Sequence, residues 1–163
     1  MTHTVELLLD DDLDRHVRGW WRRLRDAGLA SLAAHPHPTN RPHLTVVTAA
    51  SLAGLRPLPL PIPVELGPVR MLGRALVLGV TATARLRDLH HEVVSALADP
   101  EPWPPPPQWV PHVSLALRMP EEQRAAALDL FAGEPPARGH LVAARSYDSR
   151  TRTVVDLDPS CGP

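Results

Sequence analysis

The residues best suited to chemistry in this chain stand in two copies of one short phrase. The copies are Pro42-His43-Leu44-Thr45-Val46 and Pro111-His112-Val113-Ser114-Leu115. Alternate side chains of an extended strand point to the same side, so in each copy the imidazole shares a face with its own hydroxyl. A fold that brings the two strands together gathers two imidazoles and two hydroxyls around one small space. Such a set suits acid–base chemistry on a phosphate.

One such phrase on its own is more typical of a strand histidine that bonds to a neighbouring carbonyl. Two copies at matching positions of a repeated chain favour a functional site instead. We therefore expect His43 and His112 to be catalytic, with Thr45 and Ser114 binding the substrate.

The elements that must position the phrases also occur twice. A shift of 69 residues, which lays His43 on His112, lays the apolar run Leu7–Leu9 on Leu76–Leu78 and one helical pattern on the other. Each half reads strand, helix, proline-rich loop, strand. If the halves pack about a pseudo-twofold axis, equivalent positions meet there and the two histidines face each other.

Apolar spacing, caps and breakers predict the individual elements. Strands are expected at Val5–Leu9, His43–Thr48, Val64–Leu72, Ala75–Thr81, His112 to about Met119, Gly139–Ser146 and Thr153–Asp158. Helices are expected from a cap at Asp10–Asp12 to Gly28, from a cap at Thr83 through Leu97, and at Glu121–Ala132. Prolines mark 35–42, 56–63 and 99–111 as loops.

Composition and charge are ordinary for a globular protein and compatible with a small anionic ligand. The 163 residues carry a net charge of −1, which is not the basic balance of a protein that holds long nucleic acid. All 17 basic residues are arginine, so a lysine nucleophile is excluded. The single cysteine, Cys161, excludes a disulfide framework and fits a reducing compartment. No signal peptide or membrane span is recognisable, so we expect a cytoplasmic monomer without a membrane partner.

The two phrases, each behind a helix in a duplicated α+β chain, resemble the two-histidine phosphoesterase superfamily. Within it the chain is most similar to the 2′-5′ RNA ligase family, which includes RNA 2′,3′-cyclic phosphodiesterases. The run Val142–Ser146 is similar to the family's last hairpin, and Ser114 replaces the commoner threonine but keeps the hydroxyl. The resemblance implies a single two-lobed domain over residues 1–163. It also implies two antiparallel sheets around a V-shaped groove, with helices outside and no metal or other cofactor.

The resemblance also implies roles for the histidines, although the residues alone leave the two roles interchangeable. On a ribose 2′,3′-cyclic phosphate, His112 is the base that deprotonates the attacking water, and His43 is the acid that protonates the departing ribose oxygen. The hydroxyls of Thr45 and Ser114 bond to the non-bridging oxygens.

The expected partner is therefore a small nucleotide or an RNA end, with a 2′,3′-cyclic phosphate as the leading substrate. A second interpretation keeps the enzyme class but takes a 2′-5′ linkage, cleaved or ligated, or another small cyclic phosphate. A third is a nucleotide-binding module without turnover. Two titratable groups argue against the third, because binding alone does not require them.

Further candidates are less specific. Arg41 and Arg118 flank the phrases, and Arg145 belongs to the hairpin that resembles the family's, so each is expected to reach a phosphate. Trp109, in the loop before the second phrase, either stacks on a base or packs against prolines. The pairs His35/His37 and His90/His91 have no further ligands at a recognisable spacing, so solvated histidines are favoured over a metal site.

Overall fold

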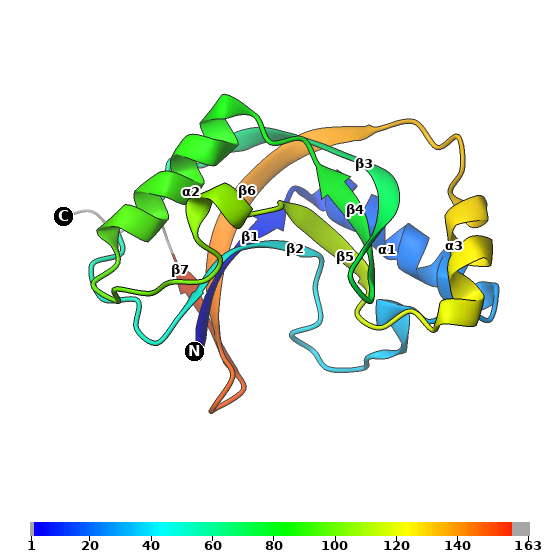
Figure 1. Ribbon diagram of the computed structural model, residues 1–163, viewed down its shortest axis with the longest axis horizontal. Coiled ribbons are helices and arrows are strands. Elements are labelled where there is room, and N and C mark those ends of the chain that lie inside the picture. Colours follow the sequence, from blue (N-terminus) through cyan, green and yellow to red (C-terminus); the bar gives the residue numbers. More distant parts are fainter. Residues whose placement is uncertain (1, 158–163) are drawn as a thin grey trace.

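A single seven-stranded antiparallel sheet runs through the computed structural model, which describes residues 2–157 (Figure 1). Its order is β1-β2-β5-β4-β3-β6-β7. The strands are β1 (His3–Leu9), β2 (His43–Ala49), β3 (Ile62–Leu72), β4 (Ala75–Val80), β5 (His112–Ala116), β6 (Ala137–Asp148) and β7 (Thr153–Leu157). The α-helices are α1 (Asp11–Asp26), α2 (Ala84–Ala96) and α3 (Arg124–Leu130). Cys161 lies outside the described residues.

The predicted α+β class is confirmed, but two separate sheets are not found. The 12-residue strand β6 pairs with β3 through Ala137–Leu141 and with β1 through Leu141–Asp148. One long strand therefore joins β1 to β3, so that one continuous sheet, which curls back on itself, replaces the two sheets that the family resemblance implies.

The duplicated order of elements is present as β1-α1-β2 and β4-α2-β5. Both predicted helix caps are confirmed, since the Asp10 carboxylate accepts from the Leu13 N–H and the Thr83 hydroxyl accepts from the Leu86 N–H. The helices lie at the periphery of the sheet, with α2 on one side of the view and α1 and α3 on the other (Figure 1). None of the helices in residues 2–157 has both the length and the apolar character needed to cross a bilayer.

Several predicted boundaries differ from the observed ones, β1 and β6 among them, and three of these differences have a physical reason. β3 begins at Ile62 and includes Pro63, because its first residues pair only with β6 and the free side needs no N–H donor. β5 ends at Ala116, where its pairing with β4 ends. The predicted helix at 121–132 begins as a 3-10 turn before α3 takes over at Arg124.

One face of the sheet packs into the core, and the opposite face carries the histidines and hydroxyls of the two phrases. Strand alternation buries Val5, Leu7 and Leu9 of β1 in the core cluster. The opposite face, called here the polar face, carries Glu6, Thr45, Val77, Ser114 and Arg145, as the strand register shows. Leu8 and Val77 are buried on this face, outside the core cluster.

Candidate functional site

The two phrases meet directly, because β2 pairs with β5 in antiparallel fashion at Leu44 and Val113. These two residues are fully buried, so their neighbours point to the polar face. The register places His43 beside Ser114 and Thr45 beside His112, with the imidazoles on one diagonal and the hydroxyls on the other. These four residues are called the quartet. Leu44 and Val113 are equivalent under the 69-residue shift, as a pseudo-twofold axis between the strands requires.

Both imidazoles of the quartet are held in the same way. The Nδ1 of His43 lies 2.7 Å from the carbonyl oxygen of Arg41, and the Nδ1 of His112 lies 2.8 Å from that of Val110. A carbonyl only accepts, so each Nδ1 carries a proton. In the neutral rings the lone pair is therefore on Nε2, the nitrogen that is left for chemistry.

Two tryptophans bond to the backbone of the quartet. The indole N–H of Trp21 on α1 donates to the carbonyl of Ser114, and that of Trp109 donates to the carbonyl of Thr45, both at 3.1 Å. Trp109 also stacks on His90 of α2, with ring centroids 4.1 Å apart. These contacts support the packing interpretation of Trp109, whereas base stacking stays a prediction.

Glu6 on β1 is the residue near the quartet that sequence reasoning missed. Its neighbours in register are Thr45 on β2 and Arg145 on β6. One carboxylate oxygen accepts from Nε of Arg145 at 2.8 Å, and the other lies 3.7 Å from Nε2 of His43. The signal available in the sequence was one acidic residue inside the apolar run 5–9.

The three arginines predicted to reach a phosphate are placed differently from that expectation. Arg145 is buried in its ion pair with Glu6. Nε of Arg41 lies 3.4 Å from the Asp14 carboxylate of α1. Arg118 lies beyond the end of β5 and lines a cavity of about 360 Å³ to which no quartet residue contributes.

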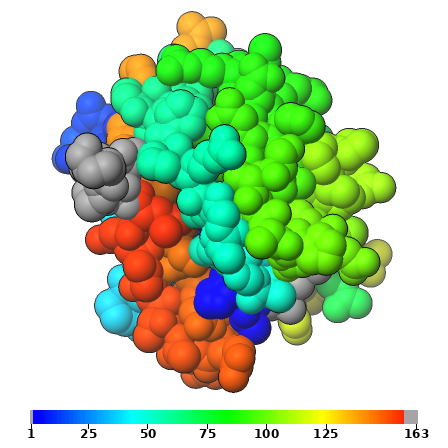
Figure 2. Space-filling view, turned by 90° about the vertical axis from the view of Figure 1, so that its left-hand side faces the viewer, coloured from blue at the N-terminus to red at the C-terminus, as the bar shows by residue number. Residues whose placement is uncertain are grey.

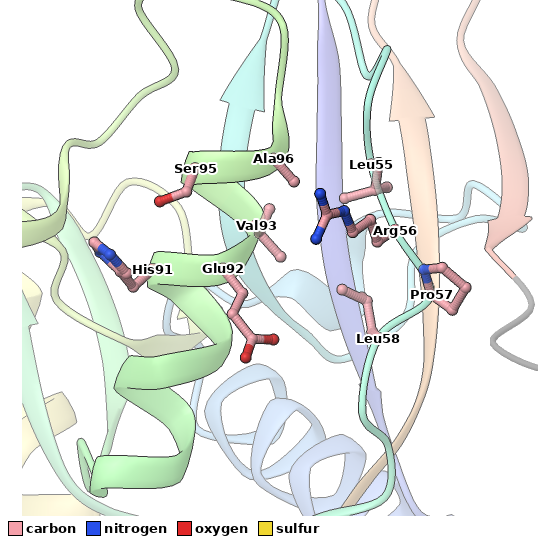
Figure 3. Close-up of a pocket in the computed structure, with 9 residues that line it drawn as sticks. All are labelled: Leu55, Arg56, Pro57, Leu58, His91, Glu92, Val93, Ser95 and Ala96. Carbon is pink, nitrogen blue, oxygen red and sulfur yellow. The ribbon is translucent and has the colours of Figure 1, made fainter.

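Another cavity, of about 450 Å³, lies between α2 and the segment 55–58. Figure 2 shows the side of the molecule where the segment at 50–61 (cyan to teal) lies against α2 (green). Val93 and Leu58 point toward each other across the gap, while His91 points away from the segment (Figure 3). The quartet does not line this cavity, so the cavity is no part of the candidate site.

Among residues 2–157, no three His, Cys, Asp or Glu side chains lie in a group that could hold a metal ion. The prediction that His90 is solvated is wrong, since its side chain is 2% exposed and its Nε2 has no partner in the described structure. Burial lowers the pKa of His90, and the nearby His91 lowers it further. His90 is therefore a neutral packing residue beneath Trp109.

Comparison with known proteins identifies the family. The family described as the 2′-5′ RNA ligase superfamily matches residues 11–147, and the chain belongs to it. Among solved structures, Usb1 from Kluyveromyces marxianus is similar in fold, with a TM-score of 0.54 and 14% sequence identity. The match covers 96% of this chain and 97% of that one. A search of curated proteins gives no match to this sequence.

The Glu6–Arg145 pair generates a stability prediction. Replacing Glu6 with Ala leaves a buried arginine without a counter-charge and lowers the free energy of unfolding by about 3–5 kcal/mol. The double variant Glu6→Leu/Arg145→Met recovers most of this loss, because no buried charge remains unpaired. Urea unfolding measures both.

The matched control for this prediction is the exposed pair of Arg138 and Glu65, in which the arginine side chain is 79% exposed. Arg138→Ala changes the free energy of unfolding by less than about 1 kcal/mol. Equal effects of Glu6→Ala and Arg138→Ala would show that the Glu6–Arg145 pair is not an internal constraint.

The lowered pKa of His90 generates a pH prediction. In the unfolded chain His90 titrates near its usual value of 6.5, while the folded protein keeps it neutral to lower pH. Stability from this residue is present above about pH 6.5 and is lost as the pH falls below it, because the unfolded chain then binds the extra proton. His90→Phe keeps a ring against Trp109 but has no group that titrates at this position. Between pH 7 and pH 5 the melting temperature of this variant therefore falls less than that of the wild-type protein.

Thermal unfolding over this range, with the exposed His140 changed to Gln as control, checks the effect. If the melting temperatures of the wild-type protein and His90→Phe fall equally with pH, His90 is not kept neutral by burial.

Proposed function

We propose that this protein is a phosphodiesterase that hydrolyses RNA or nucleotide 2′,3′-cyclic phosphates with His43 and His112. The observation that carries the proposal is the antiparallel meeting of the two phrases at Leu44 and Val113. It gives two imidazoles with the same tautomer and two hydroxyls on one small area of the polar face. Membership of the 2′-5′ RNA ligase superfamily supports phosphodiester chemistry.

The charges around the quartet favour one assignment of acid and base. Protonated His43 forms an ion pair with the carboxylate of Glu6, whose oxygen lies 3.7 Å from Nε2. The β4 neighbour of His112 is Gly79, which carries no charge. We therefore assign His43 as the proton donor and His112 as the proton acceptor, which agrees with what the family resemblance implies.

The reaction follows from these positions. Nε2 of His112 takes a proton from water as the water oxygen bonds to phosphorus. Nε2 of His43 gives its proton to the departing ribose oxygen as the P–O bond breaks, and the cyclic diester becomes a monoester. The hydroxyls of Thr45 and Ser114 donate to the non-bridging oxygens and stabilise the charge that builds there. Proton exchange with solvent restores both rings.

The substrate occupies a groove between two lobes in this proposal. The first lobe contains β1, β2, β6 and β7, and the second contains β3, β4 and β5. β2 and β5 lie at the junction, so a phosphate over the quartet contacts one imidazole and one hydroxyl from each lobe.

Removal of either imidazole tests the proposal. His43→Ala and His112→Ala each lower kcat on a 2′,3′-cyclic mononucleotide by about 10²- to 10⁴-fold, because each removes one proton transfer. Product formation followed by chromatography gives the rate and shows which monoester forms. His140→Gln, an exposed histidine on β6, is the control and keeps the wild-type rate.

Full activity in either alanine variant would remove the mechanism. Turnover of a 2′-5′ dinucleotide without turnover of the cyclic phosphate would establish the second interpretation. Saturable nucleotide binding without any turnover would establish the binding module.

A change of leaving group tests the acid–base assignment. A p-nitrophenolate departs without a proton, so it does not need a general acid. We compare the rate of His43→Ala with the wild-type rate on each substrate. This ratio is at least about tenfold higher on a nucleoside p-nitrophenyl phosphate diester than on the cyclic phosphate, whose leaving group is a ribose oxygen. His112→Ala still lacks its base and recovers nothing. Recovery by His112→Ala alone would reverse the assignment.

A further inference from the structure

The two halves of the sheet place an arginine at equivalent positions relative to the quartet. Adjacent residues in register form one row across three strands in each half. The rows are Arg145–Glu6–Thr45 on β6, β1 and β2, and Arg70–Val77–Ser114 on β3, β4 and β5. Each hydroxyl of the quartet is therefore followed, two strands away, by an arginine.

The middle residue of each row determines whether the arginine has a neighbouring counter-charge. In the first half, Glu6 neutralises Arg145 in a buried ion pair. In the second half the middle residue is Val77, which is fully buried and apolar. Among residues 2–157 no ion pair involves Arg70, so the second half carries an uncompensated positive charge.

Arg70 points to the polar face and toward His112. Its neighbours Val69 and Met71 pack against the core, so the exposed side chain of Arg70 projects to the opposite side. Its Nε lies 3.5 Å from the position that a Cβ on Gly79 would occupy. Gly79 is the β4 partner of His112, so the Arg70 side chain lies against β4 beside a residue that has no side chain.

We propose that Arg70 forms a second anion subsite on the His112 side of the quartet, which binds a phosphate of the substrate other than the reacting one. The proposal rests on the proposed function, because it takes the quartet as the place of the reacting phosphate. Arg70 stands two strands from Ser114, about 10 Å along the sheet, which suits a neighbouring phosphate. Its planar guanidinium binds phosphate oxygens in pairs. The preferred substrate is therefore an RNA end or another nucleotide with a further phosphate.

Paired substrates isolate this subsite. One is a nucleoside 2′,3′-cyclic phosphate, and the other is the same compound with an added 5′-phosphate. Arg70→Gln raises KM for the substrate with the 5′-phosphate by about tenfold and leaves its kcat within about twofold of the wild-type value. For the substrate without the 5′-phosphate, both KM and kcat stay within about twofold. Arg70→Lys, which keeps the charge without the fork, has an intermediate effect. Arg150→Gln, the same charge change in the exposed β6–β7 turn, affects neither substrate.

Two outcomes overturn the subsite. An equal loss on both substrates would place Arg70 at the reacting phosphate or in the packing of the sheet, and no loss on either would leave it without a role.

Absence of turnover by the wild-type protein would instead overturn the proposed function. Calorimetry then tests the subsite by itself, with a nucleoside 3′,5′-bisphosphate and the matching 3′-monophosphate as probes. The subsite stands if the wild-type protein binds the bisphosphate about tenfold more tightly and Arg70→Gln removes the difference. It is overturned if the difference is absent or survives the substitution.

Discussion

The candidate site depends on one backbone contact, the antiparallel pairing of Leu44 with Val113. Both side chains are buried in the core, and because strand side chains alternate, this fixes the four neighbouring side chains on the other face. A slip of one residue in either strand would turn its histidine and its hydroxyl into the core. β1 and β4 hold β2 and β5 from their outer sides, and Trp21 and Trp109 bond to the inner carbonyls.

The two halves share a framework but differ in charge, so the two ends of the candidate site are not equivalent. The histidine hydrogen bonds repeat at equivalent positions, as do the arginines two strands away. On the strand between the quartet and the arginine, one half carries Glu6, and the other half carries Val77 and Gly79. A symmetric pair of imidazoles thus faces a carboxylate on one side and a free guanidinium on the other.

Local patterns in the sequence predicted the elements and the face that each histidine shares with its hydroxyl, because strand alternation needs only neighbouring residues. The meeting of the two phrases was expected from the repeat, which relates residues 69 apart. The caps at Asp10 and Thr83 follow from the same kind of local chemistry. Contacts between distant strands that the repeat does not relate were not predictable. The Glu6–Arg145 pair joins residues 139 apart in the chain, and the joining of the two groups of strands depends on how far β6 continues past Leu141. The burial of His90 depends on Trp109 folding over it.

The convergence of two imidazoles on one phosphate is tested most directly by long-range proton–nitrogen NMR of the histidine rings, with a nucleoside 3′-monophosphate as ligand. In the free protein, His43 and His112 should both carry a proton on Nδ1, since each bonds to a carbonyl oxygen. Because one phosphate lies between the two rings, the Nε2 signals of both should shift together at the same ligand concentration. A ligand that shifts one ring alone, or neither, would contradict it.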